Sequence, residues 1–129
     1  MGNSESLHPA EWFTIADKDL NRARYLLQGD DLEGAGFYLQ QAVEKYLKGY
    51  LLSKGWTLRR IHNLETLINE ALAYDPTFEA FRVPCRKISR YYVIDRYPPR
   101  PRSELTETEI KESLQAAEEI IAQIKTNDN

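Results

Sequence analysis

The sequence predicts an all-α fold, a four- to five-helix up-and-down antiparallel bundle. Apolar residues recur every three or four positions in five segments, the spacing that gives a helix one buried face. No segment of four or more residues alternates apolar and polar side chains as a half-buried strand does. Only short breaks separate the five segments, and helices joined by short turns pack as antiparallel neighbours. With 129 residues, 42% of them hydrophobic, the chain is expected to form one domain with an ordered core over about residues 9–125.

The first two predicted helices are the longest. The first runs from about Pro9 to Gln28 and ends at a break over residues 29–31, Gly-Asp-Asp. The second runs from about Leu32 to Lys54, with Gly55 as a C-cap, and its wide apolar stripe indicates a central place in the bundle. Three glycines within it each cost about 1 kcal/mol of helix propensity relative to alanine, so we expect them where helices approach closely. They are Gly34, Gly36 and Gly49.

A short third helix is predicted after a loop at residues 56–62. Asn63 can cap its first turn, and the helix is expected to run to about Tyr74. The pair Asp75-Pro76 then breaks the chain, and proline suits the first turn of a fourth helix that runs to about Val93.

Prolines shape the rest of the chain. Pro84 lies inside the fourth segment and should kink that helix or mark a late start. Residues 95–103 contain three prolines and are expected to be irregular. Thr106 and Glu109 then form a capping-box pattern for a last helix, which runs to about Lys125.

Charge is unevenly distributed along the chain. The segment from Arg82 to Arg102 holds seven of the 17 basic residues and one of the 20 acidic residues, so it carries +6 while the whole chain carries −3. A basic segment on an acidic body indicates a local site for an anion, and argues against a protein that coats nucleic acid over its whole surface.

Three motifs of the chain are typical of one known family. The first is the string FYLQQAVEKYLK at residues 37–48, and the second is His-Asn-Leu at residues 62–64. The third is Tyr92 followed by Arg-Tyr-Pro at residues 96–98. They resemble, in this order, the second helix of the HEPN family, its step into the third helix and its "Y…RYP" signature, and the resemblance covers about residues 10–125.

The resemblance implies a helical bundle that is commonly dimeric and is often paired with a minimal nucleotidyltransferase encoded next to it. The roles proposed for the family are nucleotide binding, partnership with that transferase and, in many branches, metal-independent RNA cleavage. The cleaving branches carry an arginine followed four to six residues later by a histidine in the fourth helix. The two histidines here are His8 and His62, and neither completes that motif, because Arg59 and Arg60 lie too close before His62. We therefore expect no catalytic residues.

We expect an anion site on the fourth helix. Arg82, Arg86 and Arg90 are four residues apart and share one helix face, and guanidinium groups bind phosphate in a bidentate manner. Neighbouring tyrosines could stack on a base, and two lysines of the second helix could support the site. The alternative is a solvated face whose arginines pair with acids of neighbouring helices. The predicted ligand-binding or phosphate-binding residues are Arg86, Arg90, Arg96, Tyr92, Tyr97, Lys45 and Lys48.

Several of these residues have a simple structural alternative. Arg96 could bind exposed carbonyl groups at the helix end, where a cation is favoured. Glu44 and Lys48 have the spacing of an ordinary i,i+4 surface pair, and a surface role is favoured for Lys45 and for Lys48 when each is taken alone. His62 is expected to be structural, because the sequence guarantees neither a base nor an orienting group beside it.

We expect no metal, no cofactor and no membrane contact. The acids at residues 17, 19, 30 and 31 lack the spacing of a calcium loop, and helix surface and capping explain them. Cys85, the one cysteine, cannot form an internal disulfide, which favours a reducing cytoplasm. No apolar run approaches the roughly 20 residues of a membrane helix, and the first residues lack the pattern of a secretory signal.

The leading functional hypothesis is a non-catalytic HEPN protein. It would form a homodimer, bind a nucleotide, another phosphorylated ligand or RNA, and partner a minimal nucleotidyltransferase in a toxin–antitoxin-like pair. Two alternatives stay open: a metal-independent RNase toxin with an unconventional active site, and a pure dimerisation or assembly module.

Overall fold

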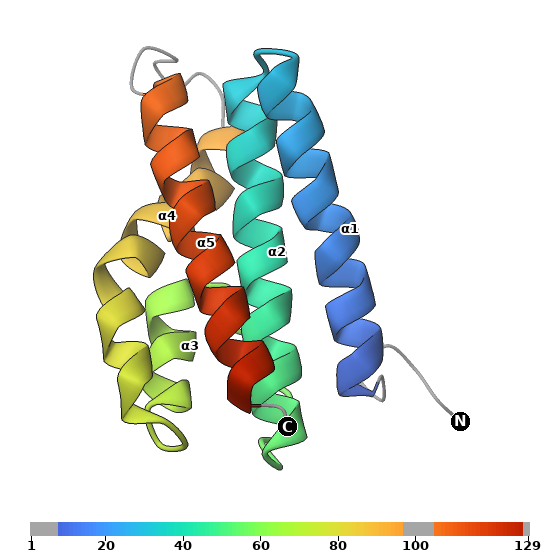
Figure 1. Ribbon diagram of the computed structural model, residues 1–129, viewed down its shortest axis with the longest axis vertical. Helices are drawn as coiled ribbons and strands as arrows, with labels where there is room; N and C mark the ends of the chain where they lie inside the picture. Colours follow the sequence, from blue (N-terminus) through green and yellow to red (C-terminus); the bar gives the residue numbers. More distant parts are fainter. Residues whose placement is uncertain (1–7, 97–104, 128–129) are drawn as a thin grey trace.

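The computed structural model describes residues 8–96 and 105–127, and every regular element in those ranges is helical. The elements are α1 (Pro9–Gln28), α2 (Leu32–Ser53), α3 (Leu64–Ala71), the 3₁₀ helix η2 (Pro76–Phe81), α4 (Arg82–Arg96) and α5 (Glu107–Asn127). The four long helices alternate in direction, and the short α3 lies beside α4 (Figure 1). This arrangement confirms the predicted all-α antiparallel bundle.

Helix α2 forms the centre of the core. It contacts α1, α3, α4 and α5, and more than half of its 22 residues are buried. Cys85 of α4 is fully buried in the same core, and burial raises the pKa of its thiol to about 12. None of the described helices combines the length and the apolar character that crossing a bilayer requires.

Two of the three glycines of α2 let neighbouring helices approach closely, as predicted, whereas Gly34 faces the side chain of Asp31, which caps the same helix. A Cβ atom on Gly49 would lie 2.7 Å from Cε1 of Phe13 in α1, closer than real side-chain atoms come. The Phe13 ring packs over Gly49 and stacks on Tyr46, with ring centroids 5.9 Å apart. On the other side, a Cβ atom on Gly36 would lie 3.1 Å from Cγ of Tyr91 in α4.

The structure decides between the two effects predicted for Pro84, a kink in the fourth helix and a late start of it. Residues 76–81 form η2, and α4 begins only at Arg82, which puts Pro84 in its first turn. A proline is tolerated there because the first amide groups of a helix have no partner within the helix. The late start, rather than a kink, is therefore the effect of this proline.

Each of the helices α1 and α2 is followed by a residue in the left-handed backbone conformation. Gly55 follows α2 with φ of +94°, and the amide of Trp56 donates to the carbonyl of Leu51 over 3.0 Å, as in a Schellman motif. After α1 the left-handed residue is Asp30, with φ of +62°, and the predicted break residue Gly29 has φ of −90°. An aspartate thus occupies the position that glycine usually takes.

Replacing Asp30 with glycine is expected to raise the free energy of unfolding by about 0.5–1 kcal/mol, because only glycine adopts this backbone conformation without strain. Urea unfolding followed by circular dichroism measures the change. Asp17→Gly is the matched control, since Asp17 is exposed within α1 and glycine there should destabilise by a similar amount. Equal losses in both variants would contradict the assignment of Asp30.

Candidate ligand-binding site

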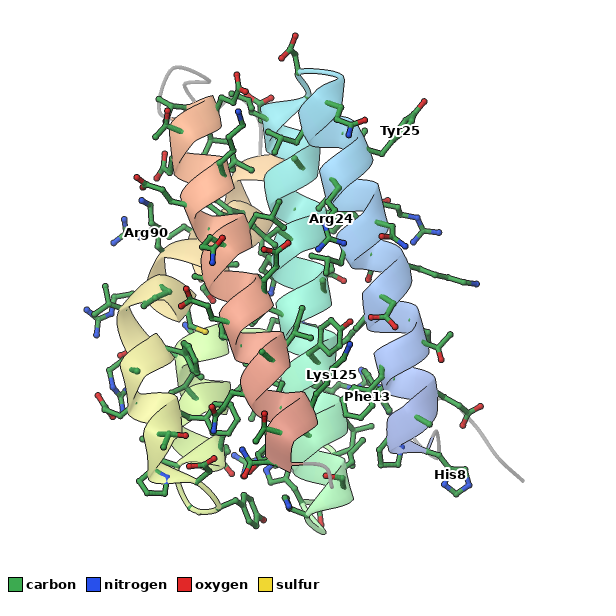
Figure 2. All side chains as sticks on the ribbon, viewed as in Figure 1. His8, Phe13, Arg24, Tyr25, Arg90 and Lys125 are labelled. Carbon is green, nitrogen blue, oxygen red and sulfur yellow. The ribbon has the colours of Figure 1, made fainter. Side chains whose placement is uncertain are left out.

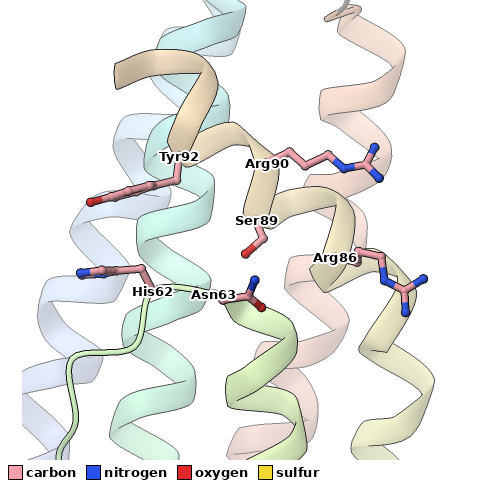
Figure 3. Close-up of a pocket in the computed structure, with 6 residues that line it drawn as sticks. All are labelled: His62, Asn63, Arg86, Ser89, Arg90 and Tyr92. Atoms are coloured by element: carbon pink, nitrogen blue, oxygen red, sulfur yellow. The ribbon is translucent and has the colours of Figure 1, made fainter. Parts of the chain in front are cut away.

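A pocket of about 390 Å³ opens where α4 faces the loop that leads into α3. Two arginines lie on one side of it, two aromatic rings lie on the other, and two neutral polar side chains lie between them (Figure 3). The described residues that line it are His62, Asn63, Arg86, Ser89, Arg90 and Tyr92. Of the predicted ligand-binding residues, the pocket thus brings together Arg86, Arg90 and Tyr92.

The middle of the pocket is held by the first turn of α3. The side chain of Asn63 caps this helix, because Oδ1 accepts a hydrogen bond from the Thr66 amide at 3.1 Å. The Leu64 amide donates to Oγ of Ser89 at 2.8 Å and so ties α4 to α3. Both oxygens act here as acceptors. The Ser89 hydroxyl proton and the Asn63 amide protons form no hydrogen bond with the residues that the structure describes, and they can serve as donors to a ligand.

The arginine stripe divides into paired and unpaired members. Arg86 holds Glu65 of α3 through two bonds, Nε to Oε1 at 3.0 Å and Nη2 to Oε2 at 2.8 Å. Arg82 binds the same carboxylate and also Glu79. The bonds from Arg86, followed by those from Arg82, lower the pKa of Glu65 to about 2. The alternative of pairing with neighbouring acids is therefore correct for these two arginines.

Arg90 differs from the other members of the stripe. It is exposed, and it projects away from the bundle (Figure 2). Among the side chains that the structure describes, those of residues 8–92 and 105–127, none forms a hydrogen bond or ion pair with its guanidinium group. Arg90 is thus the arginine of the pocket that a ligand can reach without breaking an ion pair with any of these side chains.

The aromatic side of the pocket is a stack of rings. Tyr92 lies parallel to His62, with centroids 5.3 Å apart and an angle of 11°, and it also stacks on Phe37 of α2. Nδ1 of His62 lies 3.0 and 3.2 Å from the two carboxylate oxygens of Glu44. The structure therefore supplies the orienting group that the sequence did not guarantee for this histidine.

The two lysines predicted to support the site lie elsewhere. Lys48 is only 4% exposed and pairs with buried Glu44 at 2.9 Å, so the surface role favoured for it is wrong. Lys45 is partly buried and pairs with Asp19 of α1, which is itself 2% exposed and not on the helix surface as expected. Neither lysine is among the described residues that line the pocket.

The remaining predicted residues cannot be placed in the pocket. Arg96 is the last residue of α4, but its side chain lies outside the described part of the structure. Tyr97 also lies outside the described residues. The ligand-binding roles of both stay predictions.

Comparison with known proteins assigns the chain to a family. The family model of the HEPN domain matches residues 9–127. The chain belongs to the HEPN domain family. The crystal structure of ST0689, described as an archaeal HEPN homologue, is similar to this HEPN chain with a TM-score of 0.77 and 26% identity, covering 95% of this chain and 99% of that one. The crystal structure of TT1696 from Thermus thermophilus has a TM-score of 0.76 and 28% identity, covering 92% of this chain and 96% of that one. A search of curated proteins found no significant match.

This HEPN domain places an arginine and a histidine in one pocket although its sequence lacks the spaced pair. The only histidines of the chain are His8 and His62, so α4 contains none, yet His62 lines the same pocket as Arg90. The described residues hold no cluster of three or more histidine, cysteine, aspartate or glutamate side chains able to bind a metal. The groups present can bind an anion, stack on a planar ring and exchange a proton at His62.

Proposed function

We propose that this HEPN protein is non-catalytic and binds a nucleotide or another phosphorylated ligand in the pocket between α4 and the loop into α3. The observation that carries the proposal is Arg90, an exposed residue that lines a concave site and whose guanidinium group forms no ion pair with the described side chains. A phosphate would give this group a bidentate partner without displacing any carboxylate that the structure describes.

Other residues of the pocket support the same ligand class. The Ser89 hydroxyl and the Asn63 amide supply neutral donors beside Arg90. The Tyr92 ring offers an aromatic edge for a sugar or base. Arg86 can add a second guanidinium group, but only if the ligand competes with Glu65 for it. The volume of about 390 Å³ is within the range of small-molecule sites.

The proposal extends to assembly. The protein forms a homodimer in the cytoplasm and partners a minimal nucleotidyltransferase as a toxin–antitoxin-like pair. Support comes from the three sequence motifs and from exposed apolar side chains on α1, where Tyr25 is 76% exposed and points away from the bundle (Figure 2). Sedimentation at twice the 15.0 kDa of one chain, and co-purification with such a transferase from the same genome, test it. A monomer that captures no transferase would contradict this part of the proposal.

Arg90→Ala is expected to weaken nucleotide binding by about tenfold or more, because a hydrogen-bonded ion pair with phosphate is lost. Calorimetry with ATP, the other nucleoside triphosphates and a short RNA measures the affinities. Lys87→Ala is the matched control, since Lys87 is a cation of the same helix that pairs with Glu109 at 3.5 Å and does not line the pocket. Glu65→Gln should strengthen binding a few-fold, because it releases Arg86.

The panel also separates this proposal from the assembly module. If no ligand binds while the dimer and its partner assemble normally, the protein is an assembly module. If Arg90→Ala and Lys87→Ala change binding equally, a ligand binds but not in this pocket.

An RNase with an unconventional active site is the second candidate function. The observation that favours it is the contact between Glu44 and His62 in the pocket that Arg90 also lines, because an oriented histidine can transfer protons to and from a phosphodiester. The purified protein would then cut RNA without metal, and His62→Ala would abolish cutting. Intact RNA after incubation with wild-type protein would reject this candidate.

A further inference from the structure

We infer that His62 is a ligand-binding residue of this pocket and that it holds the anionic ligand in its protonated form, so that ligand binding takes up one proton. The inference rests on the proposed function, and it assigns a role to a residue that neither the charge pattern nor the predicted site included.

The contact with Glu44 decides which ring nitrogen faces the ligand. Glu44 is 5% exposed, and its carboxylate also receives Nζ of Lys48 at 2.9 Å and Nε2 of Gln40 at 3.0 Å. A carboxylate held by these donors acts only as an acceptor, so Nδ1 of His62 carries the hydrogen and donates it. Nε2 is then the ring nitrogen that is left for the pocket.

The ring is held in place before any ligand arrives. The bond to Glu44 fixes one edge, and the parallel stack on Tyr92 fixes the plane. The His62 side chain is still 54% exposed and lines the pocket on the side opposite the two arginines (Figure 3). Fixed groups lose little conformational entropy when they bind, which favours a role in recognition.

The protonation state of Nε2 determines whether His62 attracts an anion. In the neutral ring Nε2 is an acceptor and repels a phosphoryl oxygen, whereas in the protonated ring it is a cationic donor. The titratable groups in contact with the ring are Glu44 of α2, through its hydrogen bond, and Tyr92 of α4, and Arg86 and Arg90 of α4 line the same pocket. A bound phosphate offsets the arginines and adds a partner for Nε2, so ligand and proton favour each other's binding.

The test is calorimetry with ATP at pH 6 and pH 8 on wild type, His62→Gln and His8→Gln. We expect the wild type to bind ATP about tenfold more weakly at pH 8, since one charge-assisted hydrogen bond is lost. ATP itself gains negative charge over this range, which alone would strengthen binding to arginines, so a weakening must come from the protein. His8→Gln should behave as wild type, because His8 is exposed at the start of α1 and does not line the pocket. His62→Gln should bind weakly at both pH values.

A second measurement follows the titration of the wild-type protein directly. The chain has two histidines, so proton magnetic resonance gives two imidazole signals, which the two variants assign. Saturating ATP should move the titration midpoint of the His62 signal upward by about one pH unit and leave that of His8 in place.

Each outcome decides a different question. Equal ATP affinity at both pH values, or an unmoved His62 midpoint, overturns this inference and leaves the proposed function intact. Absence of ATP binding at pH 6 also overturns it, and absence of binding across the whole ligand panel overturns the proposed function as well.

Discussion

Glu44→Ala is expected to lower the free energy of unfolding by about 3–5 kcal/mol, because it leaves the ammonium group of Lys48 buried without a partner charge. Lys48 and Glu44 are both about 5% exposed. The substitution also removes the carboxylate that holds His62. Unfolding in guanidinium chloride, followed by circular dichroism, measures the loss.

Two controls separate the effect of leaving a buried charge unpaired from the effect of removing any ion pair. Adding Lys48→Met to Glu44→Ala should recover much of the loss, since an apolar side chain can fill the space of a buried ion pair at little net cost. Glu107→Ala removes one partner of another i,i+4 pair, with Lys111, whose side chains are 54% and 60% exposed, and should cost about 0.5 kcal/mol or less. Equal losses for Glu44→Ala and Glu107→Ala would contradict the argument.

Asp75→Ala is expected to cost about 2–3 kcal/mol, because one carboxylate joins the start of η2 to the end of α5. Its Oδ1 accepts from the amide and the hydroxyl of Thr77 at 2.9 and 2.7 Å. Its Oδ2 accepts from Gln123 at 3.0 Å and from Asn127 at 2.6 Å. A lost helix cap and two lost bonds between elements account for the magnitude. Urea unfolding of the variant measures it.

The same carboxylate should make stability depend on acid. Hydrogen bonds from Thr77, Gln123 and Asn127 lower the pKa of Asp75 from 3.8 to about 2. A lowered pKa means that the ionised group stabilises the fold at pH values above 3.8, and that this contribution disappears as the pH falls toward 2. Asp75→Asn keeps the shape and removes the charge, so its difference in stability from wild type should shrink between pH 5 and pH 2. A constant difference would reject the role of the charge.

The helices were predictable where local signals mark their ends. Pro9 and the break at residues 29–31 define α1 at the predicted positions, and Asn63 caps α3 as predicted. Other helix ends were less accurate, including the one before the Asp75-Pro76 break. The third helix stops at Ala71 instead of about Tyr74, and α4 continues to Arg96 instead of about Val93.

The pairing of charges between helices was not predictable from spacing. Glu44 and Lys48 have the spacing of a surface pair, and only packing shows that α2 is covered on that face by the loop carrying His62. One sequence signal pointed to the burial of this pair. The apolar residues of α2 occupy so much of its circumference that little of the helix is left for solvent. Glu65 pairs with Arg82 and Arg86 because α3 packs on α4, and no local sequence pattern encodes that packing.

The buried thiol of Cys85 allows local opening of the fold to be measured by chemical labelling. Thiol reagents attack the thiolate, which is scarce at neutral pH when the pKa is about 12, and the side chain is fully buried. Modification therefore has to wait until α4 separates from the bundle, and because this is the one cysteine, no other site contributes to the signal. The labelling rate under native conditions then gives the opening free energy of the helix that carries Arg86, Arg90 and Tyr92. A ligand that fastens these residues would slow the labelling without touching the sulfur.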